Sequence, residues 1–178
     1  PKEDALWHSW AWYAKGIAFY NTGNMHESVS AFEVALDFGK ASGNIYVISS
    51  IAIKIAESEQ QLGKYKHAYK RCVDLLEYIK GKGYGNITND EWMYAPLYFI
   101  LGTSQFSWGE YEKAFGNIKT AYKLCEGVND IFLRVTTLMV YSFVLKELGD
   151  PDFKNKFDEL DRIFASGEMP LTLRYSYI

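Results

Sequence analysis

The three histidines are the first residues of this sequence to consider for metal binding or proton transfer, and their spacing favours neither role. His26-Glu27 begins the zinc-protease pattern His-Glu-x-x-His, but Ser30 stands where the second histidine is needed. His8, His26 and His67 share no metal-ligand spacing. We therefore expect surface or corner histidines and no bound metal.

Two glycine-rich segments lack the context of a catalytic loop. Residues 39–43, GKASG, do not have the Gly-x-Ser-x-Gly spacing of a nucleophile elbow and are typical of a helix end followed by a linker. Residues 81–85, GKGYG, follow a predicted helix, whereas a phosphate cradle follows a strand. We interpret both as connections, and we expect no catalytic residue, no cofactor and no enzymatic activity.

The most basic stretch is KYKHAYKR, residues 64–71. A nucleic-acid patch would need its cations on one face, but they are spread around a predicted helix, and Tyr65 belongs to a turn. The net charge of −3 gives no global attraction to nucleic acid or anionic lipid. We interpret the stretch as a solvated face and expect no nucleic-acid partner.

The remaining bulk features favour a cytoplasmic chain with no membrane contact. The most apolar run, near residues 45–53, falls short of the roughly 18 apolar residues of a spanning helix. The N-terminal PKED does not begin a signal peptide. We expect Cys72 and Cys125 to be small buried residues in a reducing compartment. Because the sequence starts at Pro1 without a methionine, we expect a piece of a longer protein.

A sequence pattern recurs along the chain: a glycine, a bulky residue two positions later, and a small residue three positions after that. Its glycines are 40, 46 and 40 residues apart, a period typical of stacked supersecondary units. The glycines are Gly23, Gly63, Gly109 and Gly149. In the first three copies of the pattern, the bulky residues are Met25, Tyr65 and Tyr111, and the small residues are Ser28, Ala68 and Ala114.

Each glycine lies between two segments with helical periodicity. It therefore marks a tight turn between antiparallel helices, where a positive φ suits glycine. The small residue lets the second helix pack closely on the first. The sequence predicts an all-α fold of about four antiparallel helix pairs within residues 1–166. The predicted units are 5–43, 44–82, 88–128 and 129–166, followed by a C-terminal tail, 167–178.

This pattern resembles the tetratricopeptide repeat (TPR), whose signature combines a Gly-x-Tyr-x-x-Ala turn with small and aromatic positions on the flanking helices. The resemblance implies a superhelix with a concave groove. It covers roughly residues 5–160 and weakens in the fourth unit, where Pro151 and Lys154 replace the bulky and small residues. That departure suits a terminal, capping repeat.

Two stretches resemble a narrower family, the MalT-like helical sensor region of LuxR-type bacterial transcriptional regulators. They are GIAFYNTGNMHESVSAFEVALDFGKASGN, residues 16–44, and LGTSQFSWGEYEKAFGNIKTAYKLCEGVND, residues 101–130. The resemblance implies that an ATP-binding domain precedes the repeats, that a helix-turn-helix domain follows them, and that the repeats receive an inducer or a regulatory protein. This sequence contains the motif of neither flanking domain.

A second apolar stripe remains on the first helix of each pair after the packing stripe is assigned. The TPR resemblance places this stripe on the concave groove. The predicted ligand-binding residues are Trp10, Tyr13, Ile17, Tyr20, Phe99, Thr103, Phe106 and Phe143. The second pair contributes Ile53, Glu57 and Gln60. Alternatively, the stripe packs against neighbouring helices or missing domains.

The function favoured by these patterns is binding. The main hypothesis is the sensor segment of a LuxR-type regulator, with a small-molecule effector or a regulatory protein in the aromatic groove. The alternative is a general TPR adaptor that binds a helical or extended peptide. Self-association into a homo-oligomer is a further expectation, because the ends of a solenoid expose apolar surface.

Overall fold

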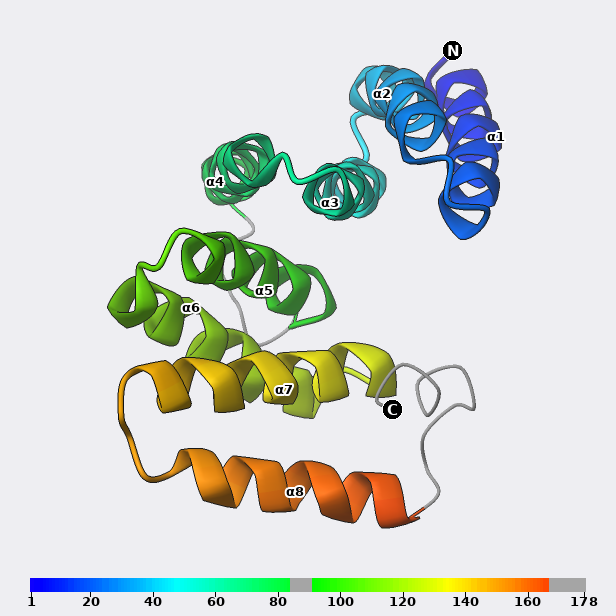
Figure 1. Cartoon of the computed structure of the whole chain (residues 1–178). Helices are drawn as coiled ribbons and strands as arrows, with labels where there is room; N and C mark the ends of the chain where they lie inside the picture. The colour runs from blue at the N-terminus through cyan, green and yellow to red at the C-terminus, as the bar shows by residue number, and fades with distance from the viewer. Residues whose placement is uncertain (84–90, 167–178) are drawn as a thin grey trace. The chain divides into compact units, whose positions relative to one another are not determined.

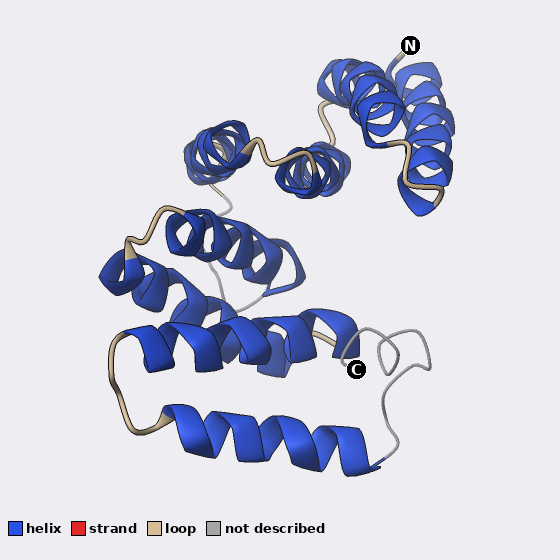
Figure 2. Cartoon of the chain, viewed as in Figure 1, coloured by secondary structure: helices blue, strands red, loops and turns tan. Residues whose placement is uncertain are grey.

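The computed structural model describes residues 1–83 and 91–166, and all regular structure in these ranges is helical (Figures 1 and 2). The prediction of an all-α fold is confirmed. The predicted tail, 167–178, lies outside the described residues. The helices are α1 (Lys2–Asn21), α2 (Met25–Ser42), α3 (Ile45–Gln61), α4 (Tyr65–Gly81), α5 (Glu91–Ser107), α6 (Tyr111–Leu124), α7 (Ile131–Glu147) and α8 (Phe153–Ser166). A short 3₁₀ turn, η2 (Cys125–Gly127), follows α6.

The helices fall into two compact units, α1–α4 and α5–α8. Each unit consists of two antiparallel hairpins, and each is described by itself. Within a unit, every helix packs mainly on its neighbours in sequence, so that α2 packs on α1 and α3, and α7 packs on α6 and α8. Contacts between consecutive elements are typical of helical repeats, in which each hairpin is stabilised by the next.

The four predicted turn glycines all join the two helices of a hairpin. Their φ angles lie between 70° and 79°, in the left-handed region that glycine adopts without steric cost. In each turn the residue after the glycine donates its N–H to the carbonyl five residues earlier, as Asn24 N does to Phe19 O at 2.9 Å. The equivalent bond joins Asp150 N to Leu145 O at 2.9 Å. This is the Schellman motif, and it satisfies carbonyls that the helix end leaves free.

Small residues let the two helices of a hairpin approach closely. Ser28, Ala68 and Ala114 are fully buried, as the repeat predicts. On the partner helices, a Cβ on Gly16 would lie 2.4 Å from the ring of Phe32, and one on Gly102 would lie 2.5 Å from Ile118 Cγ1. These distances are far shorter than van der Waals contact, so a side chain cannot be added at either glycine without moving its neighbour.

Polar side chains start the helices that open two of the hairpins. Asn44 accepts from the backbone N–H of Tyr46 at 3.0 Å, and Asp130 accepts from Leu133 N at 3.0 Å. Gly43, which precedes the first of these caps, has φ 72° and ends α2. One residue therefore ends a helix, and the next caps the following helix.

A first prediction concerns the close approach at Gly102. We expect Gly102→Ala to lower the free energy of unfolding by about 1–3 kcal/mol, because the new methyl group overpacks the contact with Ile118. Gly116→Ala is the matched control on α6, where an added Cβ meets nothing within 4 Å. That variant should be stabilised by up to about 1 kcal/mol, because alanine favours the helix. Urea unfolding followed by circular dichroism measures both, and equal stability of the two variants would contradict the packing argument.

Candidate binding surfaces

The predicted binding residues of α1 form a row that remains accessible after folding. Trp10 is 42% exposed, while Tyr13, Ile17 and Tyr20 are half-buried. The rings of Trp10 and Tyr13 meet edge to face at 5.5 Å, and the ring of Tyr13 lies 5.5 Å from that of buried Phe32. The core therefore fixes one side of the row and leaves the other side open. We call these four residues the α1 row.

An ion pair of α3 lies beside the α1 row. Lys54 Nζ donates to Glu57 Oε2 at 2.6 Å and lies 5.7 Å from the ring centroid of Tyr20. Burial lowers the pKa of Lys54, but the carboxylate of Glu57 outweighs it, so the pKa of Lys54 is raised and the ammonium stays charged. Burial raises the pKa of the Tyr13 and Tyr20 hydroxyls. The surface thus combines aromatic rings with a fixed cation and anion.

The contribution of α3 differs from the sequence prediction. Ile53, which was expected on the accessible stripe, is 5% exposed and belongs to the core. Lys54, the next residue, was not predicted to belong to this surface. Its spacing of three from Glu57, with opposite charge, is the signal that could have identified it.

The predicted residues of unit 2 are also partly accessible. Phe99 and Phe106 are half-buried against the core around Ile118, and the ring of Phe106 lies 5.5 Å from that of Tyr111. The hydroxyl of Thr103 donates to its own helix, at 2.9 Å from Phe99 O.

The fourth predicted residue of unit 2 lies at the boundary between two helices. Phe143 of α7 is 39% exposed and meets Phe157 of α8 edge to face at 5.7 Å. All eight predicted residues are therefore accessible in part. Their union into a single groove stays a prediction, because four belong to each unit.

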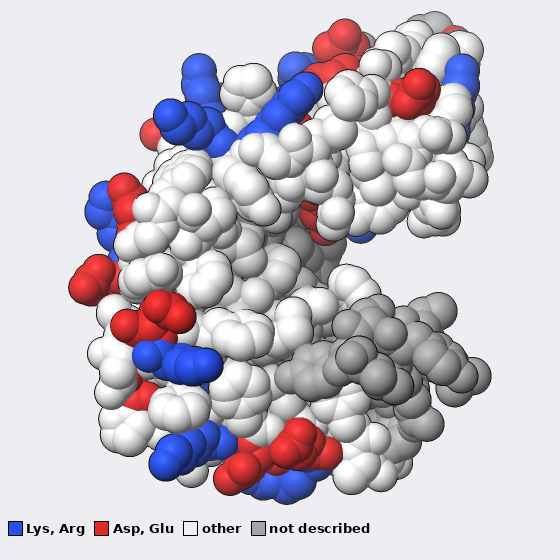
Figure 3. Space-filling view, viewed as in Figure 1, with Lys and Arg blue, Asp and Glu red and all other residues white. Residues whose placement is uncertain are grey.

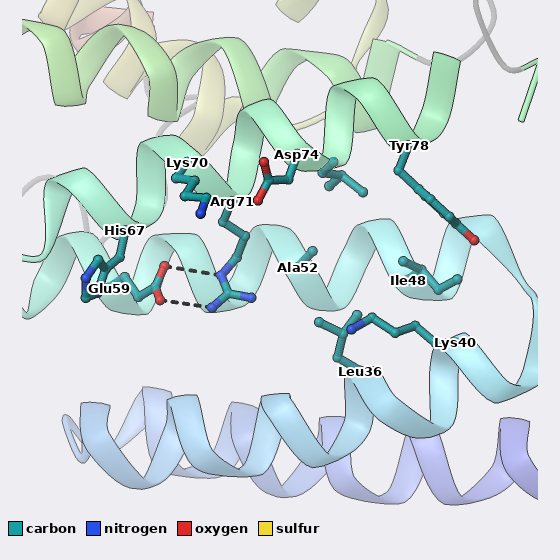
Figure 4. Close-up of a pocket in the computed structure, with 11 residues that line it drawn as sticks. Leu36, Lys40, Ile48, Ala52, Glu59, His67, Lys70, Arg71, Asp74 and Tyr78 are labelled. Atoms are coloured by element: carbon teal, nitrogen blue, oxygen red, sulfur yellow. Dashed lines mark hydrogen bonds and ion pairs between the residues drawn. The ribbon is translucent and has the colours of Figure 1, made fainter. Parts of the chain in front are cut away.

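A pocket of about 540 Å³ lies on a different face of unit 1, between α2, α3 and α4 (Figure 4). None of the α1 row contributes to its lining. Its floor is apolar and is formed by the nearly buried residues Leu36, Ile48, Ala52 and Leu75. Its rim carries charged side chains of α2 and α4, and Figure 3 shows basic side chains gathered on the surface over α4.

Arg71 closes one end of this pocket by joining three helices. Its guanidinium donates to both carboxylate oxygens of Glu59 on α3, at 3.0 and 3.2 Å, and to Glu33 Oε1 on α2 at 2.7 Å. Burial lowers the pKa of Arg71, but the hydrogen bonds and charges of the two carboxylates outweigh it and raise that pKa. The side chain of Glu59 is only 8% exposed, so Arg71 neutralises a carboxylate that would otherwise be buried unpaired.

The interpretation of residues 64–71 as a solvated face is therefore wrong for Arg71, whose side chain is 24% exposed. The sequence does not show that Glu33 and Glu59 converge on it. One signal was present in the repeat: Gln105 and Asn117 occupy the positions of the third hairpin that Glu59 and Arg71 occupy in the second. Asn117 Nδ2 donates to Gln105 Oε1 at 2.7 Å. When a pair of polar residues recurs at the same two inward-facing positions of successive hairpins, the recurrence predicts a hydrogen bond between the two residues.

The two cysteines are buried and free, as predicted. Burial raises the pKa of both thiols, so they stay protonated and unreactive near neutral pH. Within residues 1–83 and 91–166, no cluster of His, Cys, Asp or Glu could hold a metal ion. No helix in these ranges combines the length and the apolar character needed to span a bilayer.

The paired helices, Schellman turns and close-packed small positions define the class of this protein: it has a TPR-like fold. No family model and no curated protein matches the sequence. Solved structures match the fold. The resemblance to LuxR-type sensor regions gains no support from these comparisons and stays a prediction.

Three of the similar solved structures illustrate the likeness. The apo form of RapI is 17% identical, with a TM-score of 0.77 over 92% of this chain and 58% of RapI. BtubC from P. vanneervenii is 19% identical, with a TM-score of 0.71 over 91% of this chain and 65% of BtubC. The C-terminal TPR-containing domain of a Plasmodium falciparum protein is 15% identical, with a TM-score of 0.61 over 84% of this chain and 94% of that domain. This chain therefore spans about three fifths of the first two proteins, and the likeness shows the fold alone.

A second prediction tests the Arg71 network. Arg71→Met should lower the free energy of unfolding by about 2–3 kcal/mol, because it leaves the carboxylate of Glu59 buried without its cation. The double variant Glu59→Met/Arg71→Met should recover at least half of that loss. Lys80→Met, an exposed change on the same helix, should stay within about 0.5 kcal/mol of the wild type. Urea unfolding measures all three, and a double variant no more stable than Arg71→Met would refute the explanation.

A third prediction concerns alkaline pH. Tyr13 and Tyr20 have raised pKa values in the folded chain, so above about pH 10 the unfolded chain loses these protons first. The stability that the neutral hydroxyls contribute is present below that pH and is lost as the pH rises through the folded pKa values. Tyr20→Phe should make the fall in stability between about pH 9 and 11 less steep. Unfolding curves across that range measure the slope, and an unchanged slope would show that Tyr20 does not contribute.

Proposed function

We propose that this chain is a non-catalytic protein-interaction module that binds an apolar peptide segment along the α1 row. The observation that carries the proposal is the accessibility of this row: four large side chains on consecutive turns of one helix stay open to solvent in part, although the row borders the buried residues of that helix, Ser9 and Gly16. The TPR-like fold supports binding in general, because helix pairs of this kind present extended surfaces to partners.

The dimensions of the α1 row suit a segment of chain better than a compact molecule. From Trp10 to Tyr20 the row extends about 15 Å along the helix axis, which is the length of four or five residues of an extended peptide at about 3.3 Å each. A small molecule is usually enclosed on most of its surface. The α1 row is one accessible edge of a helix, and none of its residues lines the pocket shown in Figure 4.

The neighbouring charges would orient such a segment. Lys54 and Glu57 hold each other at 2.6 Å beside Tyr20, so Lys54 can donate and Glu57 can accept one further hydrogen bond while the pair stays intact. Aromatic side chains supply large contact area at a low cost in conformational entropy, and tryptophan is enriched among residues that dominate binding energy. Trp10 is therefore the expected anchor of the interface.

The regulator hypothesis is a finer version of the same proposal. In it, the partner on the α1 row would be an inducer or a regulatory protein of a LuxR-type transcriptional regulator. Its support is the resemblance of residues 16–44 and 101–130 to the sensor regions of such regulators. The fold agrees equally well with an adaptor. The peptide-binding proposal does not depend on it.

A fourth prediction tests the proposal with a phage-displayed library of random peptides selected on the whole chain. We expect selected peptides to be rich in apolar residues and to bind with about micromolar affinity. Trp10→Ala should weaken their binding about tenfold or more, because removing an aromatic anchor costs more than about 1 kcal/mol. Fluorescence polarisation with labelled peptides measures the dissociation constants.

Trp7→Ala is the matched control, since Trp7 is a 73% exposed residue of the same helix. It lies about 100° around the helix from the middle of the α1 row. Its binding should equal that of the wild type. A selection that yields no binder, or binders that Trp7→Ala weakens as much as Trp10→Ala, would end the assignment of the row. Thermal unfolding of both variants checks that each is folded.

A further inference from the structure

We propose that the pocket between α2, α3 and α4 is a second ligand site, which takes a small amphipathic monoanion with an apolar body and one acidic group. The site is independent of the α1 row, because it lies on another face of unit 1 and shares none of its residues. Its volume of about 540 Å³ is within the usual range for small-molecule sites.

The floor of the pocket sets the apolar part of the ligand. Leu36 of α2, Ile48 and Ala52 of α3, and Leu75 of α4 line the pocket and are each 4–5% exposed. At one end stands Tyr78, which is 37% exposed and points along the opening between α2 and α4 in Figure 4. Aliphatic side chains below and an aromatic ring at the end suit a flat hydrocarbon body.

The opposite end is closed by the Arg71 network, in which the carboxylate of Glu59 is already paired. Both oxygens of Glu59 accept hydrogen bonds from Arg71. The network also holds α2 and α4 at fixed positions over α3, since Arg71 of α4 reaches Glu33 of α2. The pocket is therefore preorganised, which reduces the entropic cost of binding.

The rim sets the charge of the ligand. The lining contains three cations, Lys40, Lys70 and Arg71, and two anions, Glu59 and Asp74. Arg71 already faces two carboxylates, Glu59 and Glu33. Among the described residues, the charges of the lining that form no ion pair are Lys40, Lys70 and Asp74, which together carry one net positive charge. Lys40 and Lys70 form no ion pair within the described ranges, so their ammonium groups are available. One acidic group on the ligand balances this excess, whereas a cation would add to it.

The test uses three probes of the same shape: 2-naphthoate, its neutral amide and the cationic 2-naphthylmethylamine. Each is titrated into the whole ¹⁵N-labelled chain, and amide shifts locate the site. We expect 2-naphthoate to bind in about the millimolar range or tighter, as its size allows. The shifts should be largest around residues 36–52 and 71–78. The amide should bind more weakly and the amine weakest.

Matched lysine variants separate the pocket from general attraction. Lys40→Gln and Lys70→Gln should each weaken 2-naphthoate about two- to fivefold, as expected for partly exposed charge pairs. Lys80→Gln, which removes an exposed lysine of α4 outside the lining, should leave the affinity unchanged. These surface changes do not touch the core, so the variants should remain folded.

Four outcomes would overturn the inference: no saturable shift up to about 5 mM, equal binding of the amide or the amine, equal weakening by Lys80→Gln, or shifts confined to α1. The last outcome would assign the probe to the α1 row and so leaves the proposed function standing. Conversely, failure of the peptide selection would not affect the naphthoate result, because the two experiments report on different residues.

Discussion

The structure depends on the close contact between the two helices of each hairpin. In the first hairpin Gly16 lies against the ring of Phe32, and in the third Gly102 lies against Ile118, with no room for another carbon atom. The hydroxyl of Ser28 donates to the carbonyl of Gly16 at 3.0 Å, so the same contact is both apolar and hydrogen-bonded. Because one face of α1 is fixed in this way, the rotation of the helix is set, and the α1 row lies along the edge of the buried face.

Much of this architecture could be predicted from the sequence, because its causes are local. A left-handed turn needs glycine, so Gly23, Gly63, Gly109 and Gly149 locate the turns. Close packing needs small residues at one spacing, so the periodicity identifies the buried face. Local patterns do not show what covers a face from outside the hairpin. Trp12 and Phe19 lie four residues before and three residues after the packing position Gly16, yet both are half-buried because no described helix of unit 1 covers that edge.

The candidate sites were less predictable because their members meet only after folding. All four residues of the α1 row lie on one helix, so helical periodicity was enough to predict the row. The Arg71 network joins residues 12 and 38 positions apart on three helices, so each member alone resembled an ordinary surface charge. The central helix, α3, illustrates the difficulty, since it contributes to both surfaces of unit 1. Lys54 and Glu57 lie beside the α1 row, while Ile48 and Ala52 form the floor of the pocket.

The burial of both thiols has a practical consequence. Cys72 and Cys125 are 1% and 2% exposed, and their raised pKa values keep the reactive thiolate scarce. A maleimide dye would therefore attach almost exclusively to a cysteine introduced at the surface, in an otherwise native background. One such label next to Trp10, and another in a separate variant next to Tyr78, would provide fluorescent reporters for each face of the α1–α4 unit without altering its core.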